Sequence, residues 1–213
     1  MHRRPFTRIS GTAVAALALL PLTASGATAV PAVDASDFPG LRQVAAIVPA
    51  FAGGSRTVEN DHAIWIFRRN CSSYVEGPSG EIRKWAYYYP ADDGPLLRVH
   101  IQQFASADDA KQAIRVIRRN IEGCYGTHHI EATDATLIRR PADVPALGAG
   151  RPVAWKMNDH WTEPRDGFEH SYYSRRIWMR EGETVIGVDL WGDSPVSRDA
   201  SIRLARLALT AAD

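Results

Sequence analysis

The stretch IEGCYGTHHI, residues 121–130, places one cysteine four residues before two adjacent histidines. Cysteine and histidine side chains are zinc ligands, and a cysteine with a nearby histidine is also the pairing that a thiol nucleophile and its base require. The same cysteine can instead form half of a disulfide. These alternatives decide whether the chain is an enzyme, a metal protein or a disulfide-stapled domain.

The chain contains only two cysteines, Cys71 and Cys124. In an oxidising compartment one disulfide uses both and leaves no reactive thiol. Cys124 also follows a predicted helix that ends at Gly123, and the partial negative charge at a helix C-terminus disfavours a thiolate. We therefore predict a Cys71–Cys124 disulfide rather than a catalytic cysteine.

The adjacent histidines His128 and His129 point to opposite faces if their segment is extended, so they do not easily hold one ion. A metal site would need further ligands, such as Glu131 or Asp134, and the chain has neither a helical HExxH motif nor paired CxxC motifs. We predict no metal site and no cofactor.

Two further histidines support an alternative function. His160 and His170 flank the turn-forming residues 162–167, so a hairpin could place them diagonally on one face. A small secreted hydrolase that uses carboxylates or this histidine pair is therefore the second hypothesis. Gly192-Asp193-Ser194 resembles a serine-hydrolase motif, but the following Pro195 lacks the backbone N–H that an oxyanion hole needs.

Aromatic side chains are concentrated on the predicted strands. Alternation along residues 168–180 puts His170, Tyr172, Arg176 and Trp178 on one side. A mixed aromatic and basic surface of this kind suits a sugar, a peptide or an aromatic ligand. The predicted ligand cleft comprises Trp85, Tyr87, His170, Tyr172, Arg176 and Trp178.

The N-terminal segment has the features of an export signal. Arg3, Arg4 and Arg8 precede an apolar run over residues 11–22, and Ala27-Thr28-Ala29 matches a small-x-small cleavage site. Twelve residues are too few to span a bilayer as a helix. We expect a signal peptide over residues 1–29 with cleavage near Ala29, a flexible lead over residues 30–37 and a secreted domain over residues 38–213. The Arg3-Arg4 pair leaves the choice between Sec and twin-arginine export open.

The charge balance argues against nucleic acid as a partner. The whole chain carries a formal net charge of +1, and loss of Arg3, Arg4 and Arg8 with the signal makes this −2. Nucleic-acid binding favours a concentrated basic face, and the arginine pairs at residues 118–119 and 175–176 are small. No later stretch is apolar enough for a membrane span, so we expect none in the mature chain. We also expect the protein to be a monomer.

Runs of strands closed by helices, without regular βαβ alternation, predict an α+β fold with a mainly antiparallel sheet flanked by helices. The best helix is capped by Ser106 and ends at Gly123, with an apolar stripe along one side. Each half of the chain reads as strands followed by a helix, a weak pseudo-symmetry within one domain. Helices are also expected over residues 41–51 and after a cap at residues 193–195, and strands over residues 62–67, 84–89, 96–104, 153–161, 168–180 and 185–191, with a less regular region over residues 130–153.

Residues 104–110 (FASADDA), the helix after them and Glu122-Gly123-Cys124 resemble the actinobacterial secreted sensor domains of the PknH-like extracellular class. The C-terminal stretch ETVIGVDLW, residues 183–191, with its terminal helix also fits. The resemblance covers roughly residues 38–211 and implies a ligand-sensing or cell-envelope domain, and it supports the pairing of Cys71 with Cys124. This chain lacks the second cysteine pair of that class, and Trp191 stands about where one cysteine of that pair is expected.

Together these observations predict a secreted ligand-binding or sensor-like module of the cell envelope without catalytic activity. Its partner would be an unknown small molecule or cell-wall component. The alternatives are the small hydrolase and a protein-binding, inhibitor-like module.

Overall fold

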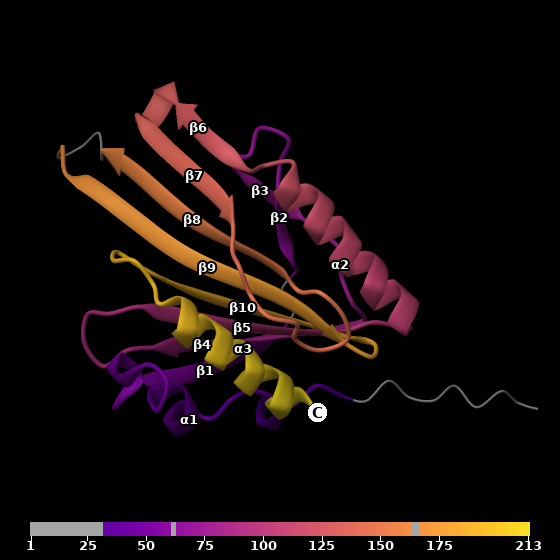
Figure 1. Ribbon diagram of the computed structural model, residues 1–213. Coiled ribbons are helices and arrows are strands. Elements are labelled where there is room, and N and C mark those ends of the chain that lie inside the picture. Colours follow the sequence, from indigo (N-terminus) through magenta and orange to yellow (C-terminus); the bar gives the residue numbers. More distant parts are fainter. Residues whose placement is uncertain (1–31, 61–62, 163–166) are drawn as a thin grey trace, which may run out of the picture.

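The strand-forming stretches assemble into one antiparallel sheet of eight strands (Figure 1). The computed structural model describes residues 32–60, 63–162 and 167–213, so the predicted signal peptide lies outside the described residues. In spatial order the strands are β1 (Ser55–Asn60), β4 (Ile82–Tyr89), β5 (Leu96–Gln103), β10 (Thr184–Gly192), β9 (Glu169–Glu181), β8 (Val153–Thr162), β7 (Ala135–Pro141) and β6 (Gly126–Ile130). The two halves of the chain meet where β5 pairs with β10.

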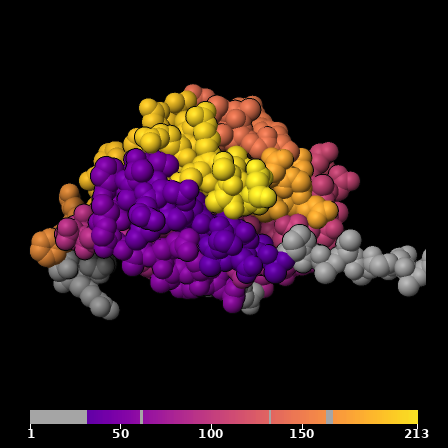
Figure 2. Space-filling view, turned by 90° about the horizontal axis from the view of Figure 1, so that it is seen from below, coloured from indigo at the N-terminus to yellow at the C-terminus, as the bar shows by residue number. Residues whose placement is uncertain are grey.

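Helices cover both faces of this sheet, which confirms the predicted α+β class. Helix α2 (Ala107–Glu122) packs on one face, and α3 (Arg198–Ala212) packs on the other (Figure 1). The short α1 (Leu41–Ala45) joins α3, and Figure 2 shows the N-terminal segment and α3 side by side. Val33, within the expected lead, is buried in this layer. We call the two surfaces of the sheet the α2 face and the α3 face.

Helix α2 forms as the sequence predicts. The Ser106 hydroxyl accepts a hydrogen bond from the Asp109 backbone N–H at 3.1 Å, and Asp108 and Asp109 lie in the positive first turn. The predicted apolar stripe is the buried one: Ala110, Ala113, Ile114, Ile117 and Ile121. Gly123 caps the C-terminus, which places Cys124 directly after the helix.

A two-stranded hairpin lies over the α2 face. It consists of β2 (Trp65–Phe67) and β3 (Tyr74–Glu76), and the turn between them carries Cys71. The Cys71–Cys124 disulfide, as predicted, joins this turn to the end of α2. Beside it the Asn120 side chain accepts from the Phe67 backbone N–H at 2.9 Å and donates to the Phe67 carbonyl at 2.7 Å.

Several elements differ from the sequence-based expectation. The region after Ile130 contains β7, because the pairing of β7 with β8 organises a segment that lacks clear alternation. The helix expected over residues 41–51 stops at Ala45, ahead of Pro49, since the residue before a proline disfavours the helical conformation. Helix α3 is capped by Ser197 and not at residues 193–195. The Ser197 hydroxyl accepts a hydrogen bond from the Ala200 N–H at 3.3 Å.

The central strand β10 is densely packed, because its side chains are buried on both faces of the sheet. Trp178 on β9 lies across Gly187 on β10, and a Cβ atom added to Gly187 would approach the Trp178 ring to 2.5 Å. The indole is 5% exposed, and it is a rigid ring rather than the end of a flexible side chain. A side chain at position 187 therefore conflicts with the core.

We expect Gly187→Ala to lower the free energy of unfolding by about 1–3 kcal/mol, because the new methyl group overpacks the core. Gly123→Ala is the matched control: its φ is −69° and the added Cβ would meet its nearest atoms at 3.4 Å, an ordinary contact. Urea unfolding of both variants measures the difference. Equal stability of the two variants would contradict the steric explanation.

Candidate functional site

The structure brings the predicted cleft residues to one surface, the α2 face. Trp85 on β4 and Trp178 on β9 lie on either side of His100, whose ring centroid is 5.4 Å from Trp85 and 5.2 Å from Trp178. Tyr87 and Arg176 lie in the next cross-strand row, and Tyr172 follows along β9. His170 stands apart near the end of β9, where it is exposed and stacks on Trp161 at 5.3 Å.

A buried ion-pair network connects these residues. Asp189 on β10 pairs with Arg98 at 3.1 Å and with Arg176 at 2.9 Å, and its side chain is 5% exposed. The Arg98 guanidinium lies over three rings, with centroids at 5.1 Å for Trp85, 5.6 Å for Tyr87 and 5.4 Å for Trp191. Most of the charged groups and aromatic rings of the predicted cleft are therefore already in contact with one another.

A second ion pair, Arg139–Asp159, extends the network toward the edge of the sheet. Burial raises the pKa of the Asp159 carboxyl, and the nearby Arg139 opposes this rise. Burial likewise raises the pKa of the Tyr172 hydroxyl, with the neighbouring Asp189 acting in the same direction. Neutral Tyr172 is therefore the form that this face holds.

The β2–β3 hairpin covers this face. The Tyr74 hydroxyl donates a hydrogen bond to the Met157 sulfur at 3.8 Å, and the Arg176 guanidinium lies 5.5 Å from the centre of the Tyr74 ring. The cavity that remains beneath Trp65, beside Arg98 and Trp178, has a volume of about 10 Å³. This volume holds about one water molecule. The predicted residues do share a face, and their role as a ligand cleft stays a prediction.

The predicted pairing of His160 with His170 is wrong. His160 on β8 lies opposite Ser171, and His170 lies opposite Trp161, so the two histidines point to opposite faces. A change of one residue in register moves a side chain to the other face of a sheet. His160 Nδ1 contacts Ser171 Oγ at 2.8 Å, but within the described residues no carboxylate contacts His160 to complete a triad.

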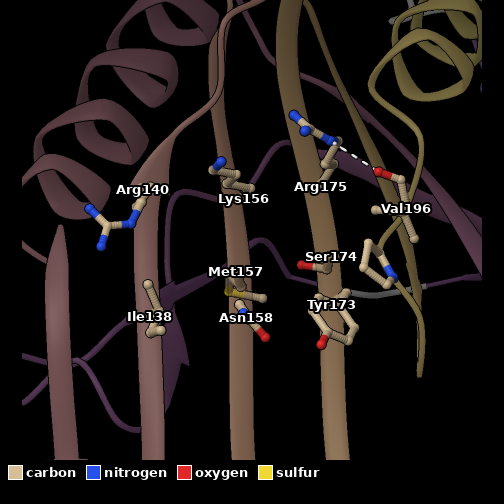
Figure 3. A pocket seen from close by; sticks show the side chains of 10 residues that line it. Ile138, Arg140, Lys156, Met157, Asn158, Tyr173, Ser174, Arg175 and Val196 are labelled. Carbon is tan, nitrogen blue, oxygen red and sulfur yellow. Dashed lines mark hydrogen bonds between the residues drawn. The ribbon is translucent and has the colours of Figure 1, made fainter.

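The open hollow lies instead on the α3 face, over β7, β8 and β9 (Figure 3). Its volume is about 270 Å³, and part of its wall is the loop before α3, at Pro195 and Val196. Two cross-strand rows supply most of the remaining lining. The first row is Arg140, Lys156 and Arg175, and the second is Ile138, Asn158 and Tyr173.

The first of these rows, which we call the cation row, is electrostatically unfavourable by itself. Arg140 pairs in register with Lys156, and Lys156 pairs with Arg175, so three like charges stand directly opposite one another. Like charges at such positions destabilise a sheet. The pocket lining contains no carboxylate, and among the described residues none of the three cations forms a salt bridge.

Arg175 is the most constrained member of the cation row. It is partly buried, and its Nε donates to the Val196 carbonyl at 3.3 Å, as Figure 3 shows. Burial lowers the pKa of Arg175, and the nearby cation Arg198 lowers it further. A guanidinium held in this way gains more than a solvated one from an incoming negative charge.

A second hollow of about 410 Å³ lies on the other side of the same loop. It shares Pro195 and Val196 with the first pocket, and Leu190 and Ala200 contribute further apolar lining. The loop over residues 193–197 is therefore a common wall, and the Arg175–Val196 hydrogen bond attaches it to β9.

Sequence reasoning missed the cation row because its members come from three strands. The Arg175-Arg176 pair was noticed, but alternation sends these neighbours to opposite faces, with Arg176 buried against Asp189. The register of β7 with β8 and of β8 with β9 is the information that would have revealed the row.

The described residues contain no group of three or more metal-ligating side chains in a suitable arrangement. His128 Nε2 instead faces the Cys124 carbonyl at 3.0 Å, and His129 lies 3.9 Å from Asp134. None of the described helices is long and apolar enough to cross a bilayer.

Comparisons with known proteins show the fold. The chain is similar to the extracellular domain of PknH from Mycobacterium tuberculosis, with a TM-score of 0.54 and 14% identity over 85% of this chain and 98% of that domain. The expected resemblance is therefore confirmed at the level of the fold. LpqN of the same organism, described as involved in cell envelope biogenesis, is also found, with a TM-score of 0.26 and 14% identity over 73% of this chain and 80% of LpqN. No family model matches, and no curated protein matches by sequence.

Proposed function

We propose that this chain is a secreted, monomeric envelope module that binds a small anionic ligand and has no catalytic activity of its own. The observation that carries the proposal is the cation row Arg140–Lys156–Arg175, which lines an open pocket without a carboxylate. A bound anion would relieve the repulsion along the row. The second row offers the Ile138 side chain and the Tyr173 ring to an apolar part of the ligand.

The size of the pocket limits the ligand. A volume of about 270 Å³ lies just below the usual range of small-molecule sites, which begins at about 300 Å³. A phosphorylated or carboxylated monosaccharide is of this size. The predicted export signal and the disulfide support a location outside the cytoplasm, as does the fold shared with an extracellular domain.

Glucose 6-phosphate and glucose are matched probes, because they differ by one phosphate. We expect the wild-type protein to bind glucose 6-phosphate at least about tenfold more tightly in isothermal titration calorimetry, since charged hydrogen bonds contribute more than neutral ones. Lys156→Gln and Arg175→Gln each reduce this affinity about tenfold. Arg203→Gln, an exposed cation on α3, leaves it unchanged.

Lys156 is exposed, and its side chain forms no hydrogen bond or ion pair with the other described residues, so Lys156→Gln is not expected to affect folding. Equal binding of the two sugars, or equal loss in Lys156→Gln and Arg203→Gln, would refute the pocket as an anion site. The sugars stand for a class of ligand and not for the physiological compound.

The α2 face is a second candidate ligand surface, as the sequence predicts. The observation in its favour is that two buried polar atoms, Ser174 Oγ and Trp155 Nε1, have no hydrogen-bond partner among the described residues. A ligand could satisfy them after displacement of the β2–β3 hairpin. Thermal-shift measurements with N-acetylglucosamine test this: stabilisation only after the disulfide is reduced supports it, and no shift in either state opposes it.

A further inference from the structure

A separate basic pocket lies between α2 and the far end of β9, beside the loop over residues 147–152. Its volume is about 320 Å³, and its apolar lining includes Ile114, Leu147 and Trp178. Five cations surround it, and no carboxylate lines it among the residues that the structure describes. The cations are Lys111, Arg115, Arg118, Arg151 and Arg180.

We propose that this pocket binds a ligand carrying two or more phosphate or sulfate groups. The proposal is independent of the cation row, which lies on the other face of the sheet. A ligand with one negative charge would neutralise only one of these five positive charges, so a ligand with several charges suits the pocket better. The mature chain is expected to carry a net negative charge, so this concentration is local and does not reflect a basic chain.

Two of the arginines are oriented by carbonyl groups rather than by acids. Arg118 Nη2 donates to the Arg151 carbonyl at 2.6 Å, and Arg180 donates to the carbonyls of Gly182 at 2.9 Å and Ala149 at 3.2 Å. Among the described residues none of the five cations forms a salt bridge. The guanidinium groups are thus held in position while their charges stay available, which lowers the entropy cost of binding.

The loop that completes the pocket is held on β9 by its backbone. The Ala149 N–H donates to the Arg180 carbonyl at 2.7 Å. Gly148 has a φ of +63°, and an added Cβ would approach the Arg180 carbonyl oxygen to 2.5 Å. Only glycine permits this close approach, which sets Arg151 opposite the cations of α2.

The shape of the site favours a compact ligand over a nucleic acid strand. A nucleic acid is bound along an extended basic groove, whereas these five cations surround one pocket of about 320 Å³. A phosphorylated sugar or a phosphoinositide headgroup presents several charges within that volume. The apolar lining would contact its ring.

Inositol hexakisphosphate is the probe for the shared chemistry, measured by isothermal titration calorimetry at several salt concentrations. The test variant is K111Q/R115Q, because both residues are exposed and neither side chain forms a hydrogen bond or ion pair with the other described residues. We expect about a tenfold or greater loss of affinity at low salt and a weaker dependence of affinity on salt concentration, because two of the five cations are removed. R203Q/R206Q removes the same charge from exposed positions on α3 and is expected to bind as the wild type does.

Lys156→Gln separates this site from the cation row: it is expected to leave inositol hexakisphosphate binding intact. No binding by the wild type at low salt, or the same loss in R203Q/R206Q as in K111Q/R115Q, overturns the proposal. Matching thermal unfolding of both double variants shows that folding is not the cause.

Vesicles and DNA distinguish the sources of the charged group. Binding to phosphatidylcholine vesicles that contain phosphatidylinositol 4,5-bisphosphate, lost in K111Q/R115Q, supports the proposal with a lipid headgroup as the source. Binding to inositol hexakisphosphate alone supports it with a soluble source. Tighter binding of a short single-stranded DNA than of inositol hexakisphosphate, lost in the same variant, overturns the compact-ligand proposal in favour of nucleic acid.

Discussion

Replacement of Cys71 and Cys124 together by alanine is expected to lower the free energy of unfolding by about 4 kcal/mol. The disulfide closes a loop with a sequence separation of 53, and its loss restores the entropy of that loop to the unfolded chain. Guanidinium unfolding of the oxidised protein and of the double variant measures the difference. Wild-type protein unfolded in a reducing agent should lose a similar amount.

The same variant has a local signature, because the bridge ties the β2–β3 turn to the end of α2. Backbone amides of the hairpin should exchange with solvent faster, while those of β5 and β10 in the centre of the sheet keep their protection at conditions far from global unfolding. Asn120→Ala, which removes the neighbouring side-chain contacts to Phe67, is the control that leaves the bridge intact. An unchanged midpoint after reduction would show that the bridge contributes nothing to stability.

Asp189→Asn is expected to destabilise the fold by about 3–5 kcal/mol, because it leaves the charges of Arg98 and Arg176 without their shared partner. The Asp189 side chain is 5% exposed, so water does not replace the lost carboxylate. Asp193→Asn, an exposed position just beyond the same strand, is the matched control and should change stability by less than about 0.5 kcal/mol.

A triple variant separates the cost of unpaired charge from the loss of packing. Replacing Asp189 by leucine and both Arg98 and Arg176 by methionine removes the three charges that meet at Asp189, so most of the lost stability should return. Chemical unfolding compares the triple variant with Asp189→Asn. If the triple variant is no more stable than Asp189→Asn, the buried charges are not the cause.

The helices and strands of the core were predictable where a short stretch of sequence carries the whole signal. Helix α2 combines a capping serine, acids in its first turn and an apolar stripe of helical period, and the structure buries that stripe. The strands β4, β5, β9 and β10 carry aromatic and β-branched residues, and they form close to their expected limits. The final helix was expected as well, but its start was misplaced because Ser194 and Ser197 are equally good caps by residue type.

The sheet edges and the coverage of both faces were not predictable in this way. Alternation in β5 separates Val99 from His100, which suggests one wet face, yet His100 is 3% exposed because the β2–β3 hairpin and α2 cover that side. The strands β1 and β7 carry mixed or polar residues, and pairing with β4 and β8 defines them. Long-range pairing of this kind has no local signature.

The amino-acid sequence alone determined the disulfide, since two cysteines allow only one bridge, and it determined the fold class through the order of helices and strands. Alternation also placed Trp85 with Tyr87, and Tyr172 with Arg176 and Trp178, because it is a property of each strand by itself. The pairing of β4, β5, β10 and β9 is what brings the two sets to the same face. Only the tertiary structure decided that this face is closed by a hairpin and that the open pockets lie elsewhere. Arg140, Lys156 and Arg175 become neighbours solely through strand register, and Lys111 reaches Arg151 and Arg180 through the packing of α2 on β9. Cys124, the most reactive side chain in IEGCYGTHHI, forms the disulfide that holds the β2–β3 hairpin over the α2 face. It lines neither the pocket of the cation row nor the pocket beside α2.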